Sequence, residues 1–424
     1  MNYQNTLAFA QEQDQNDPLH HFRERFYFPQ VNKQDAIYLC GNSLGLQPKS
    51  AQMYIDNEMY KWANMAVEGH FKGEEPWVNY HELLAPGAAR VVGAKESEVV
   101  IMNQLTVNLH LMLVSFYRPQ GKRFKIITEG GAFPSDQYAL ETQTKFHGYN
   151  PDEAVIELFP REGEHTLRTE DIIGSIKEHA DELALVMMGG INYYTGQVFD
   201  MEAITKAGHE AGALVGFDLA HAAGNVPLQL HNWDVDFAVW CTYKYLNSGP
   251  GGTSGVYVHE RFGNNPNILR FAGWWGHNAK ERFQMKKGFQ PMEGAPGWQL
   301  SNGQILPMAL HRASLELFDE AGMENLRAKS EKLTGYLEFL IDDVPVGEDV
   351  LGMITPRDPQ ARGCQVSLLV KQNSRQLFDK LMEAGIIVDY REPNVIRVAP
   401  TPLYNSFEEV YRFSEILHEC LQKG

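Results

Sequence analysis

The sequence predicts an α/β protein, in which a large domain with a mostly parallel central sheet is joined to a smaller α+β domain. Between residues 123 and 241, short β-branched and apolar runs alternate with helical patterns, which is typical of a parallel sheet covered by helices on both faces. After about residue 305 this alternation stops. We therefore expect a large domain at 69–305 and a small domain at 306–424, to which an N-terminal segment at 1–68 contributes.

The elements of the large domain are expected in a definite order. Strands are expected at RFKIIT (123–128), AVIELF (154–159), LALVMM (183–188), ALVGFDLAH (213–221) and DFAVWC (236–241). Helices are expected at 103–116, 169–180 and 201–212. In the second of these helices Thr169 is the expected N-cap, and two acidic residues follow in the first turn, where the helix dipole favours negative charge.

In the small domain, strands and helices are expected to alternate in a different pattern. CQVSLLV (364–370) and NVIRVA (394–399) have the apolar, β-branched character of strands. Between them lies an amphipathic helix at 374–385, for which Gly385 is a C-terminal stop signal. In the last expected helix, which follows Asn405, Ser406 and Glu409 have the spacing of a capping box.

Composition excludes several classes of protein. The 424 residues carry a formal net charge of −17, which opposes binding to nucleic acid or to an anionic membrane surface. The four cysteines are scattered without a C-x-x-C pair, so that neither a zinc site nor a disulfide framework is expected, and no metal is assigned. The N-terminal residues lack the pattern of a signal peptide, and no apolar run is long enough to span a bilayer. We expect a cytoplasmic protein that binds a small molecule.

Two charged residues stand out against apolar surroundings. Lys244 follows the apolar run VDFAVW, and Asp218 interrupts the strand expected at 213–221. A lysine in such a place is more often a surface residue whose stem packs on apolar groups. However, the carboxyl ends of strands in open α/β sheets are where ligands bind, and a buried carboxylate needs a partner. The pair therefore indicates a ligand site.

Pyridoxal 5′-phosphate (PLP) accounts for both residues. Its aldehyde forms a Schiff base with a lysine, its ring nitrogen stays protonated beside an acidic group, and its phosphate binds backbone N–H groups. The helix expected at 103–116 offers such groups at its start, where Thr106 is equally well explained as an N-cap. The Phe133 side chain would stack on the PLP ring if Phe133 faces that ring. Taken alone, however, GGAFPSDQY has the sequence of an ordinary turn.

Several segments resemble the kynureninase family, whose members are PLP enzymes of the aspartate aminotransferase fold type (fold-type I). The matching segments are GGAFPSDQYA, FDLAHAAGNVPL, WCTYKYLNSGPGG, GWWGH and IRVAPTPLYNSF, which occur in the family's order. The resemblance begins at YLCGNSLG near residue 38 and continues to the end of the printed sequence. It is specific, because FPSD and the Trp-x-Gly-His stretch are not expected of PLP enzymes at large.

The resemblance implies a role for each matching position. Lys244 would form the Schiff base and then move the substrate's α-proton, with Tyr243 as a second catalytic residue that reaches the phosphate. The positions implied at the cofactor are Leu105, Thr106, Phe133, Pro134, Ser135, Asp136, Asp218, His221, Tyr243 and Lys244, together with Trp274 and Asn302 from a neighbouring subunit. The positions implied at the substrate are Arg397, His70, Trp275, Asn302 and Ser43.

The reaction implied by the resemblance is hydrolysis of a carbon–carbon bond. L-kynurenine, 3-hydroxykynurenine or both would give L-alanine and anthranilate or 3-hydroxyanthranilate, within tryptophan catabolism and pyridine nucleotide biosynthesis. Arg397 would bind the α-carboxylate, because a planar guanidinium suits a planar anion. A homodimer with active sites at the subunit interface is also implied. Where some members carry a hydroxyl residue ahead of YTGQ, this sequence has Gly189, so that contact is not transferred.

Two other enzyme classes stay open as alternatives. YLCGNSLG contains a Gly-x-Ser-x-Gly motif with Ser43 at its centre, as in serine hydrolases. That motif normally follows several strands, whereas residue 43 precedes the α/β core, so a tight turn lining a pocket is favoured. A cysteine desulfurase of the same fold type would need a cysteine on a mobile loop, but Cys241 and Cys364 belong to expected strands.

Overall fold

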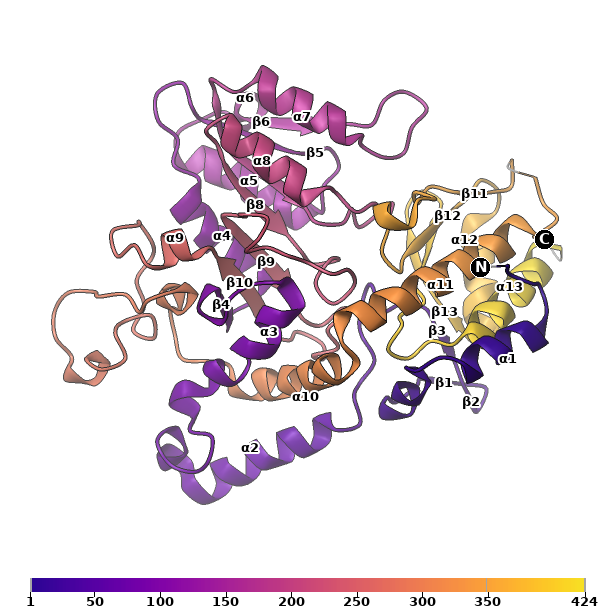
Figure 1. The fold of residues 1–424 in the computed structure, drawn as a ribbon, viewed down its shortest axis with the longest axis horizontal. Coiled ribbons are helices and arrows are strands. Elements are labelled where there is room, and N and C mark those ends of the chain that lie inside the picture. The colour runs from indigo at the N-terminus through magenta and orange to yellow at the C-terminus, as the bar shows by residue number, and fades with distance from the viewer. Residues whose placement is uncertain (1, 348, 423–424) are drawn as a thin grey trace.

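A seven-stranded sheet forms the centre of the larger lobe in the computed structural model, which describes residues 2–347 and 349–422 (Figure 1). The strand order is β4 (Val99–Met102), β10 (Ser254–Val258), β9 (Phe237–Cys241), β8 (Leu214–Asp218), β7 (Leu183–Gly189), β5 (Lys125–Glu129) and β6 (Val155–Leu158). Strands β9 to β6 in this order are parallel, and β10 is antiparallel to both of its neighbours. The predicted α/β class with a mostly parallel sheet is confirmed.

The five strands expected in the large domain all form, each within a few residues of its expected limits. Strands β4 and β10 were not expected. For β10 the reason is that the sequence before it has the composition of a glycine-rich loop. Gly255 lies inside β10, and a Cβ built there would lie 2.1 Å from the indole ring of Trp240 on β9. Glycine in this strand therefore makes room for a large neighbour, which is one of the reasons for glycine in a sheet.

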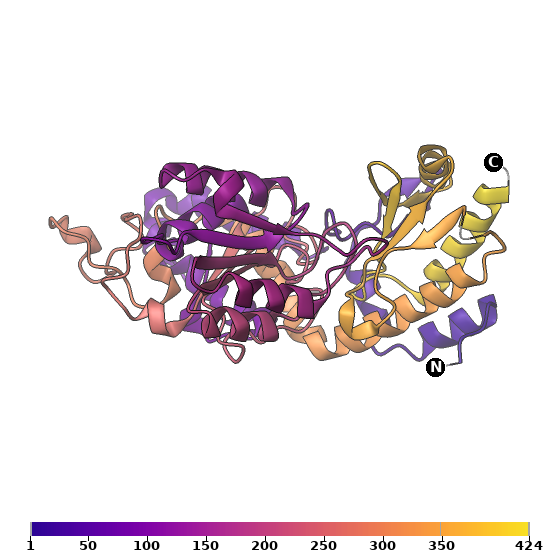
Figure 2. The ribbon, with the colours of Figure 1, turned by 90° about the horizontal axis from the view of Figure 1, so that it is seen from above.

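Helices cover both faces of this sheet (Figure 2). One face packs against α3 (Ala85–Val92), α7 (Thr169–Glu178), α8 (Met201–Glu210) and α10 (Ile305–Ala321), and the other packs against α4 (Leu105–Phe116) and α5 (Pro134–Phe146). Successive strand residues serve opposite faces, so that Val186 of β7 belongs to the first core and Leu185 to the second. This alternation follows from the two-residue period of a strand.

The smaller lobe contains a four-stranded antiparallel sheet and the helices packed on it. The strand order is β11 (Leu351–Met353), β12 (Val366–Val370), β15 (Val395–Val398) and β14 (Asp389–Arg391). Its core includes side chains from α1 (Leu7–Gln15), α11 (Met323–Asp342), α12 (Ser374–Glu383) and α13 (Phe407–Gln422). Elements from both ends of the sequence therefore build this α+β domain.

The N-terminal segment joins the smaller lobe through a short pair of strands. Strand β3 (Ile37–Tyr38) pairs in parallel with β13 (Ile386–Ile387). By contrast, α2 (Ala51–Met65) lies along α10, and residues of α10 belong to the core of the larger lobe. The domain limits expected at residues 68 and 305 stay a prediction, and this packing favours a limit between α10 and α11.

Helix ends agree with the sequence signals at two of three places. Ser406 and Glu409 form the expected capping box, with distances of 3.1 Å from Glu409 N to Ser406 Oγ and from Ser406 N to Glu409 Oε2. Gly385 follows α12 with a φ of +84°, as expected for a stop. Thr169 was wrong as an N-cap: it is the first helical residue, because the extended backbone that a cap requires occurs at Arg168.

The remaining elements are short. They are β1 (Gln30–Val31), β2 (Gln34–Asp35), α6 (Pro151–Ala154), α9 (Glu260–Gly263) and the 3₁₀ turns η1 (His20–Arg25), η2 (Ala66–His70), η3 (Trp77–Leu83), η4 (Glu96–Glu98), η5 (Arg282–Gln284), η6 (Ala295–Trp298) and η7 (Pro359–Ala361). Within residues 2–347 and 349–422, no helix combines the length and the apolar character needed to cross a membrane.

Candidate active site

A pocket opens at the carboxyl ends of the parallel strands. Asp218 is the last residue of β8, and Lys244 lies in the turn that follows the neighbouring strand β9. The pocket is small, with a volume of about 80 Å³. Its lining residues are Leu105, Thr106, Glu129, Phe133, Ser135, Asp136, Gly189, Ile191, Tyr193, Asp218, Ala220, His221, Cys241, Tyr243 and Lys244.

The amine of Lys244 lies between an imidazole and an aromatic ring. Its Nζ is 2.9 Å from Nε2 of His221 and 5.7 Å from the centre of the Phe133 ring. Burial lowers the pKa of His221, and the positive charge of Lys244 lowers it further. The imidazole is therefore neutral and can accept a hydrogen bond from the lysine amine at Nε2.

Asp218 and Asp136 form a buried carboxyl pair. The Asp218 Oδ1 accepts the N–H of Ala220 at 2.7 Å, and its carboxyl group is hydrogen-bonded to that of Asp136. Burial raises the pKa of both groups, and the neighbouring charge of Asp218 raises that of Asp136 further. The two carboxyl groups therefore do not both ionise readily, and the positive charge of Lys244 favours the carboxylate form of Asp218.

Glu129 is a third buried carboxyl group at this pocket, and the sequence reasoning missed it. Its Oε2 accepts Asn192 Nδ2–H at 2.6 Å, and its Oε1 accepts the N–H of Gly189 at 3.3 Å. Burial, assisted by the charge of Asp218, raises the pKa of Glu129 to about 7. A Cβ built at Gly189 would lie 2.6 Å from Glu129 Oε1. The space beside Gly189 is thus taken by this carboxyl group.

Two helix N-termini supply N–H groups at the pocket. Leu105 and Thr106 begin α4, and Ser135 belongs to the first turn of α5. Among the described residues, no side chain caps either helix at its start. Unpaired N–H groups and the helix dipole favour an anion such as phosphate. The stretch GGAFPSDQY is accordingly a helix entry with Pro134 at its first position, rather than an isolated turn.

These residues fit PLP. Lys244 offers an amine for the aldehyde, Asp218 offers a carboxylate for the ring nitrogen, and the start of α4 offers donors for the phosphate. Two buried polar atoms at the pocket, Asp136 Oδ1 and His221 Nδ1, have no hydrogen-bond partner among the described residues, and buried groups of this kind call for a ligand or water. The donors and acceptors of the pocket therefore complement this cofactor.

Arg397 lies near the pocket in a cluster of charged side chains. It is 1% exposed, and its Nη1 donates to the carbonyl of Tyr193 at 2.7 Å while its Nη2 donates to Asp389 Oδ2 at 2.5 Å. Burial acts to raise the pKa of Asp389, but Arg397, the Ser43 hydroxyl and Arg391 together hold it below its ordinary value. The Asp389 carboxylate is therefore ionised at neutral pH.

Several predicted site residues lie outside this pocket within one chain. His70 ends η2, with its Nδ1 3.1 Å from the carbonyl of Val67. Trp274 is exposed and donates through Nε1 to the carbonyl of Arg282, whereas Trp275 is buried in the same segment. The predicted residues that do not line the pocket are Ser43, His70, Pro134, Trp274, Trp275, Asn302 and Arg397.

The surroundings of Ser43 do not favour a serine hydrolase. Its Oγ donates to Asp389 Oδ2 at 2.5 Å, so its partner is a carboxylate rather than a histidine base. The cysteines considered for a desulfurase are also unsuited, because Cys241 and Cys364 are 3% and 0% exposed. Burial raises the pKa of both thiols, which opposes the reactive thiolate form.

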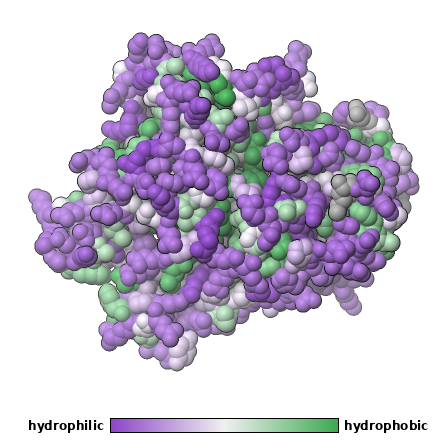
Figure 3. Space-filling model, in the orientation of Figure 1, coloured by the Kyte–Doolittle hydropathy of each residue, from purple (hydrophilic) through white to green (hydrophobic). Residues whose placement is uncertain are grey.

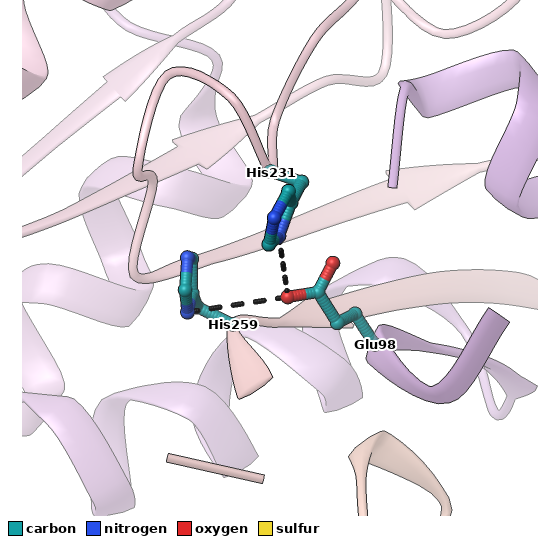
Figure 4. Close-up of side chains that lie close together, drawn as sticks. All are labelled: Glu98, His231 and His259. Atoms are coloured by element: carbon teal, nitrogen blue, oxygen red, sulfur yellow. Dashed lines mark hydrogen bonds and ion pairs between the residues drawn. The ribbon is translucent and has the colours of Figure 1, made fainter. Parts of the chain in front are cut away.

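Glu98, His231 and His259 form a second cluster, in which Glu98 directly precedes β4 and His259 directly follows β10 (Figure 4). Glu98 Oε1 lies 3.0 Å from His231 Nδ1 and 3.9 Å from His259 Nδ1. These atoms already have partners, because Glu98 Oε1 also accepts the N–H of Glu260 and His259 Nδ1 accepts that of Arg261. The cluster therefore holds the start of α9 in place.

Comparison with known proteins gives consistent matches. A family model described as the kynureninase C-terminal domain matches residues 326–417. The kynureninase of Flavobacterium johnsoniae is 55% identical over 98% of both chains, and that of Myxococcus xanthus is 56% identical over 98% of this chain and 97% of its own.

Solved structures show the same fold at low identity. The apo structure of a cysteine desulfurase from Thermococcus onnurineus has a TM-score of 0.75 at 19% identity, and covers 92% of this chain and 95% of its own. A structure of C-DES, described with glycine covalently linked to its PLP-cofactor, has a TM-score of 0.74 at 18% identity, and covers 90% of this chain and 96% of its own.

Proposed function

This chain belongs to the kynureninase family, and from that premise we propose that it hydrolyses L-kynurenine, 3-hydroxykynurenine or both, with PLP as its cofactor. The products are L-alanine and anthranilate or 3-hydroxyanthranilate. The observation that carries the proposal is the placement of Lys244 and Asp218 in one pocket at the carboxyl edge of the sheet, beside two helix N-termini. The fold shared with desulfurases does not favour that alternative, because the fold alone does not decide the reaction.

The residues of the pocket divide the work of binding and proton transfer. Lys244 Nζ would hold the cofactor aldehyde, and its amine would remove the proton from the substrate α-carbon. Asp218 would hold a proton at the ring nitrogen, and the first turn of α4 would bind the phosphate. When bound, PLP supplies an electron-accepting ring for the bonds that break at the α- and β-carbons. His221 Nε2, at 2.9 Å, orients the lysine amine.

The substrate is held by residues on two sides. Arg397 binds the α-carboxylate in this proposal, which is supported by its hydrogen bond to the carbonyl of Tyr193, a residue that lines the pocket, and by the fit of a planar guanidinium to a planar anion. His70, Trp275 and Asn302 surround the aromatic ring. We expect Asn302→Thr or His70→Ser to shift the ratio of kcat/KM between kynurenine and its 3-hydroxy form by about tenfold, whereas Arg397→Gln should lower both values together.

A homodimer would bring Trp274 and Asn302 of a neighbouring subunit to the pocket. Exposed apolar side chains occur on two neighbouring segments, and contact between Phe71 and Phe283 at a ring distance of 5.5 Å joins them into one surface. Figure 3 shows a largely hydrophilic face on which hydrophobic residues gather between the lobes and at the lower left. Exposed apolar patches of this kind mark interfaces, and Trp274 lies in the second segment.

Mixing two inactive variants tests the shared active site. Lys244→Ala and Asn302→Ala dimers should each be impaired, and exchange of their subunits should restore up to about a quarter of wild-type sites, because a mixed dimer of two-fold design contains one intact site. Activity that does not recover, although subunit exchange is shown by mass, would contradict a shared site.

The activity itself is tested by incubating the PLP-loaded protein with L-kynurenine. Anthranilate and L-alanine should appear in equal amounts, and Lys244→Ala should abolish both. Lys122→Ala, at a side chain that is 78% exposed, is the matched control and should behave as the wild type. A wild-type protein that binds PLP but releases neither anthranilate from kynurenine nor 3-hydroxyanthranilate from 3-hydroxykynurenine would refute the proposal. We also propose a cytoplasmic location, in keeping with thiols that form no disulfide among the described residues.

A further inference from the structure

The Gly-x-Ser-x-Gly turn at residues 41–45 lies between the two lobes. On the side of the larger lobe, Gly45 N donates to the carbonyl of Tyr243 at 2.8 Å, and a Cβ at Gly45 would lie 2.3 Å from the carbonyl oxygen of Lys244. On the side of the smaller lobe, Asn42 Nδ2 donates to Gln365 Oε1 at 2.9 Å. The motif is thus a close-packed connection between the catalytic lysine and the small domain.

Ser43, at the centre of this turn, is bonded to the group that holds Arg397. Its Oγ donates to Asp389 Oδ2 at 2.5 Å. Asp389 on β14 is the cross-strand partner of Arg397 on β15, so the two side chains lie on the same face of the sheet. On its other side, Asp389 Oδ1 is 3.0 Å from Arg391 Nε. The Asp389 carboxylate therefore lies between two guanidinium groups and a hydroxyl.

The contacts of Arg397 fix the plane of its guanidinium. The carbonyl of Tyr193 in the larger lobe holds Nη1, and Asp389 in the smaller lobe holds Nη2. Nε is buried and has no hydrogen-bond partner among the described residues. Bidentate binding of a carboxylate requires two parallel N–H bonds in that plane, so a rotation of the guanidinium would weaken it.

We propose that Asp389 is a positioning residue, which holds Arg397 in the orientation that binds the substrate carboxylate, and that Ser43 acts through Asp389. This inference rests on the proposed function, in which Arg397 binds that carboxylate. The charges agree with it, because Arg391, Asp389 and Arg397 together carry one surplus positive charge, which matches one carboxylate. Asp389 could instead compete with the substrate for Arg397, and the two roles predict opposite changes in KM.

Replacement of Asp389 by Asn tests the proposal, because it keeps the shape of the side chain and removes its charge. We expect KM for kynurenine to rise about tenfold, the size of one charge-assisted hydrogen bond, while kcat changes less than about threefold. Asp379→Asn is the matched control, since Asp379 forms an exposed ion pair with Arg375 in the same lobe, and it should leave KM unchanged. A lower or unchanged KM in Asp389→Asn would overturn the proposal.

Ser43→Ala, studied in a double-mutant cycle with Asp389→Asn, tests whether Ser43 acts through Asp389. We expect KM to rise about threefold in this variant, and the double variant to equal Asp389→Asn alone, because the two residues act through one carboxylate. Effects that multiply would show that Ser43 acts independently of Asp389. If Asp389→Asn does not fold, Ser43→Ala decides alone: an unchanged KM would overturn the proposal. Wild-type release of anthranilate, measured in parallel, separates failure of this inference from failure of the proposed function.

Discussion

Replacement of Glu129 by Gln should change how the stability of the cofactor-free protein depends on pH. Burial, with the charge of Asp218, raises the pKa of Glu129 from its ordinary 4.5 to about 7. Between these values the folded chain keeps a proton that the unfolded chain has lost, so the free energy of unfolding falls as pH rises. The loss is complete above about pH 7 and amounts to about 3 kcal/mol, at about 1.4 kcal/mol for each pKa step.

The free energy of unfolding of the glutamine variant does not fall with pH in this way, but the substitution itself lowers that free energy slightly. Its amide oxygen can replace Glu129 Oε2 as the acceptor for Asn192, whereas its amide nitrogen would face the N–H of Gly189. That unpaired donor costs about 1 kcal/mol. Glu129→Gln should therefore be about 1 kcal/mol less stable than the wild type near pH 4.5 and about 2 kcal/mol more stable near pH 8.

Urea unfolding followed by tryptophan fluorescence measures this difference. The wild type and the variant are compared in cofactor-free form at several pH values between about 4.5 and 8.5, at constant ionic strength. Glu383→Gln, at an exposed position near the end of α12, is the matched control and should follow the wild type at every pH. A stability difference between Glu129→Gln and the wild type that does not change with pH would refute the reasoning.

Four further substitutions test the site and the packing around it. Lys244→Ala should lose the borohydride-stable attachment of PLP, measured by mass spectrometry; attachment to another lysine in the wild type would contradict the assignment. Asp218→Ala should keep that attachment but lower kcat by about 100-fold, because the ring nitrogen loses the charge that keeps it protonated; wild-type turnover would contradict it. Gly45→Ala should lower the free energy of unfolding by at least about 2 kcal/mol, because the new Cβ would lie 2.3 Å from the Lys244 carbonyl oxygen. Gly174→Ala, where a Cβ meets nothing within 4 Å, should stabilise its helix by about 0.5–1 kcal/mol; equal destabilisation by both would count against the packing argument.

The sequence predicted the parallel part of the sheet because each of those strands is an apolar run with clear limits. It did not predict β10, because that strand begins inside a glycine-rich stretch and its Gly255 is explained only by Trp240 on the neighbouring strand. It also placed the N-cap of α7 one residue too late, at Thr169. The strand β10 depends on a neighbour that is distant in the sequence, and the N-cap of α7 depends on backbone angles. A short window of sequence shows neither the distant neighbour nor the backbone angles.

For the candidate site, Lys244 and Asp218 could be singled out because each is charged in an apolar context. Glu129 carries the same signal, an acidic residue at the end of a buried strand, and could have been found by the reasoning applied to Asp218. Asp389 offers no comparable signal, because it belongs to a three-residue edge strand. Its partnership with Ser43 depends on the strand register and on the N-terminal turn, which only the folded structure brings together.

The pairing of β3 with β13 sets an order of events during protein synthesis. Ile37 is made about 350 residues before its partner Ile386, which at about 5–20 residues per second corresponds to about 20–70 s on a ribosome. All strands of the seven-stranded sheet have been made by residue 258, so the larger domain can form during this interval. Leu39, which is 1% exposed in the folded protein, belongs to the core of the smaller lobe, and this core is complete only when α13 has been made. The segment around residue 37 is therefore made early but reaches its place late, and the Ser43 contact with Asp389 forms only after residue 389 has been made.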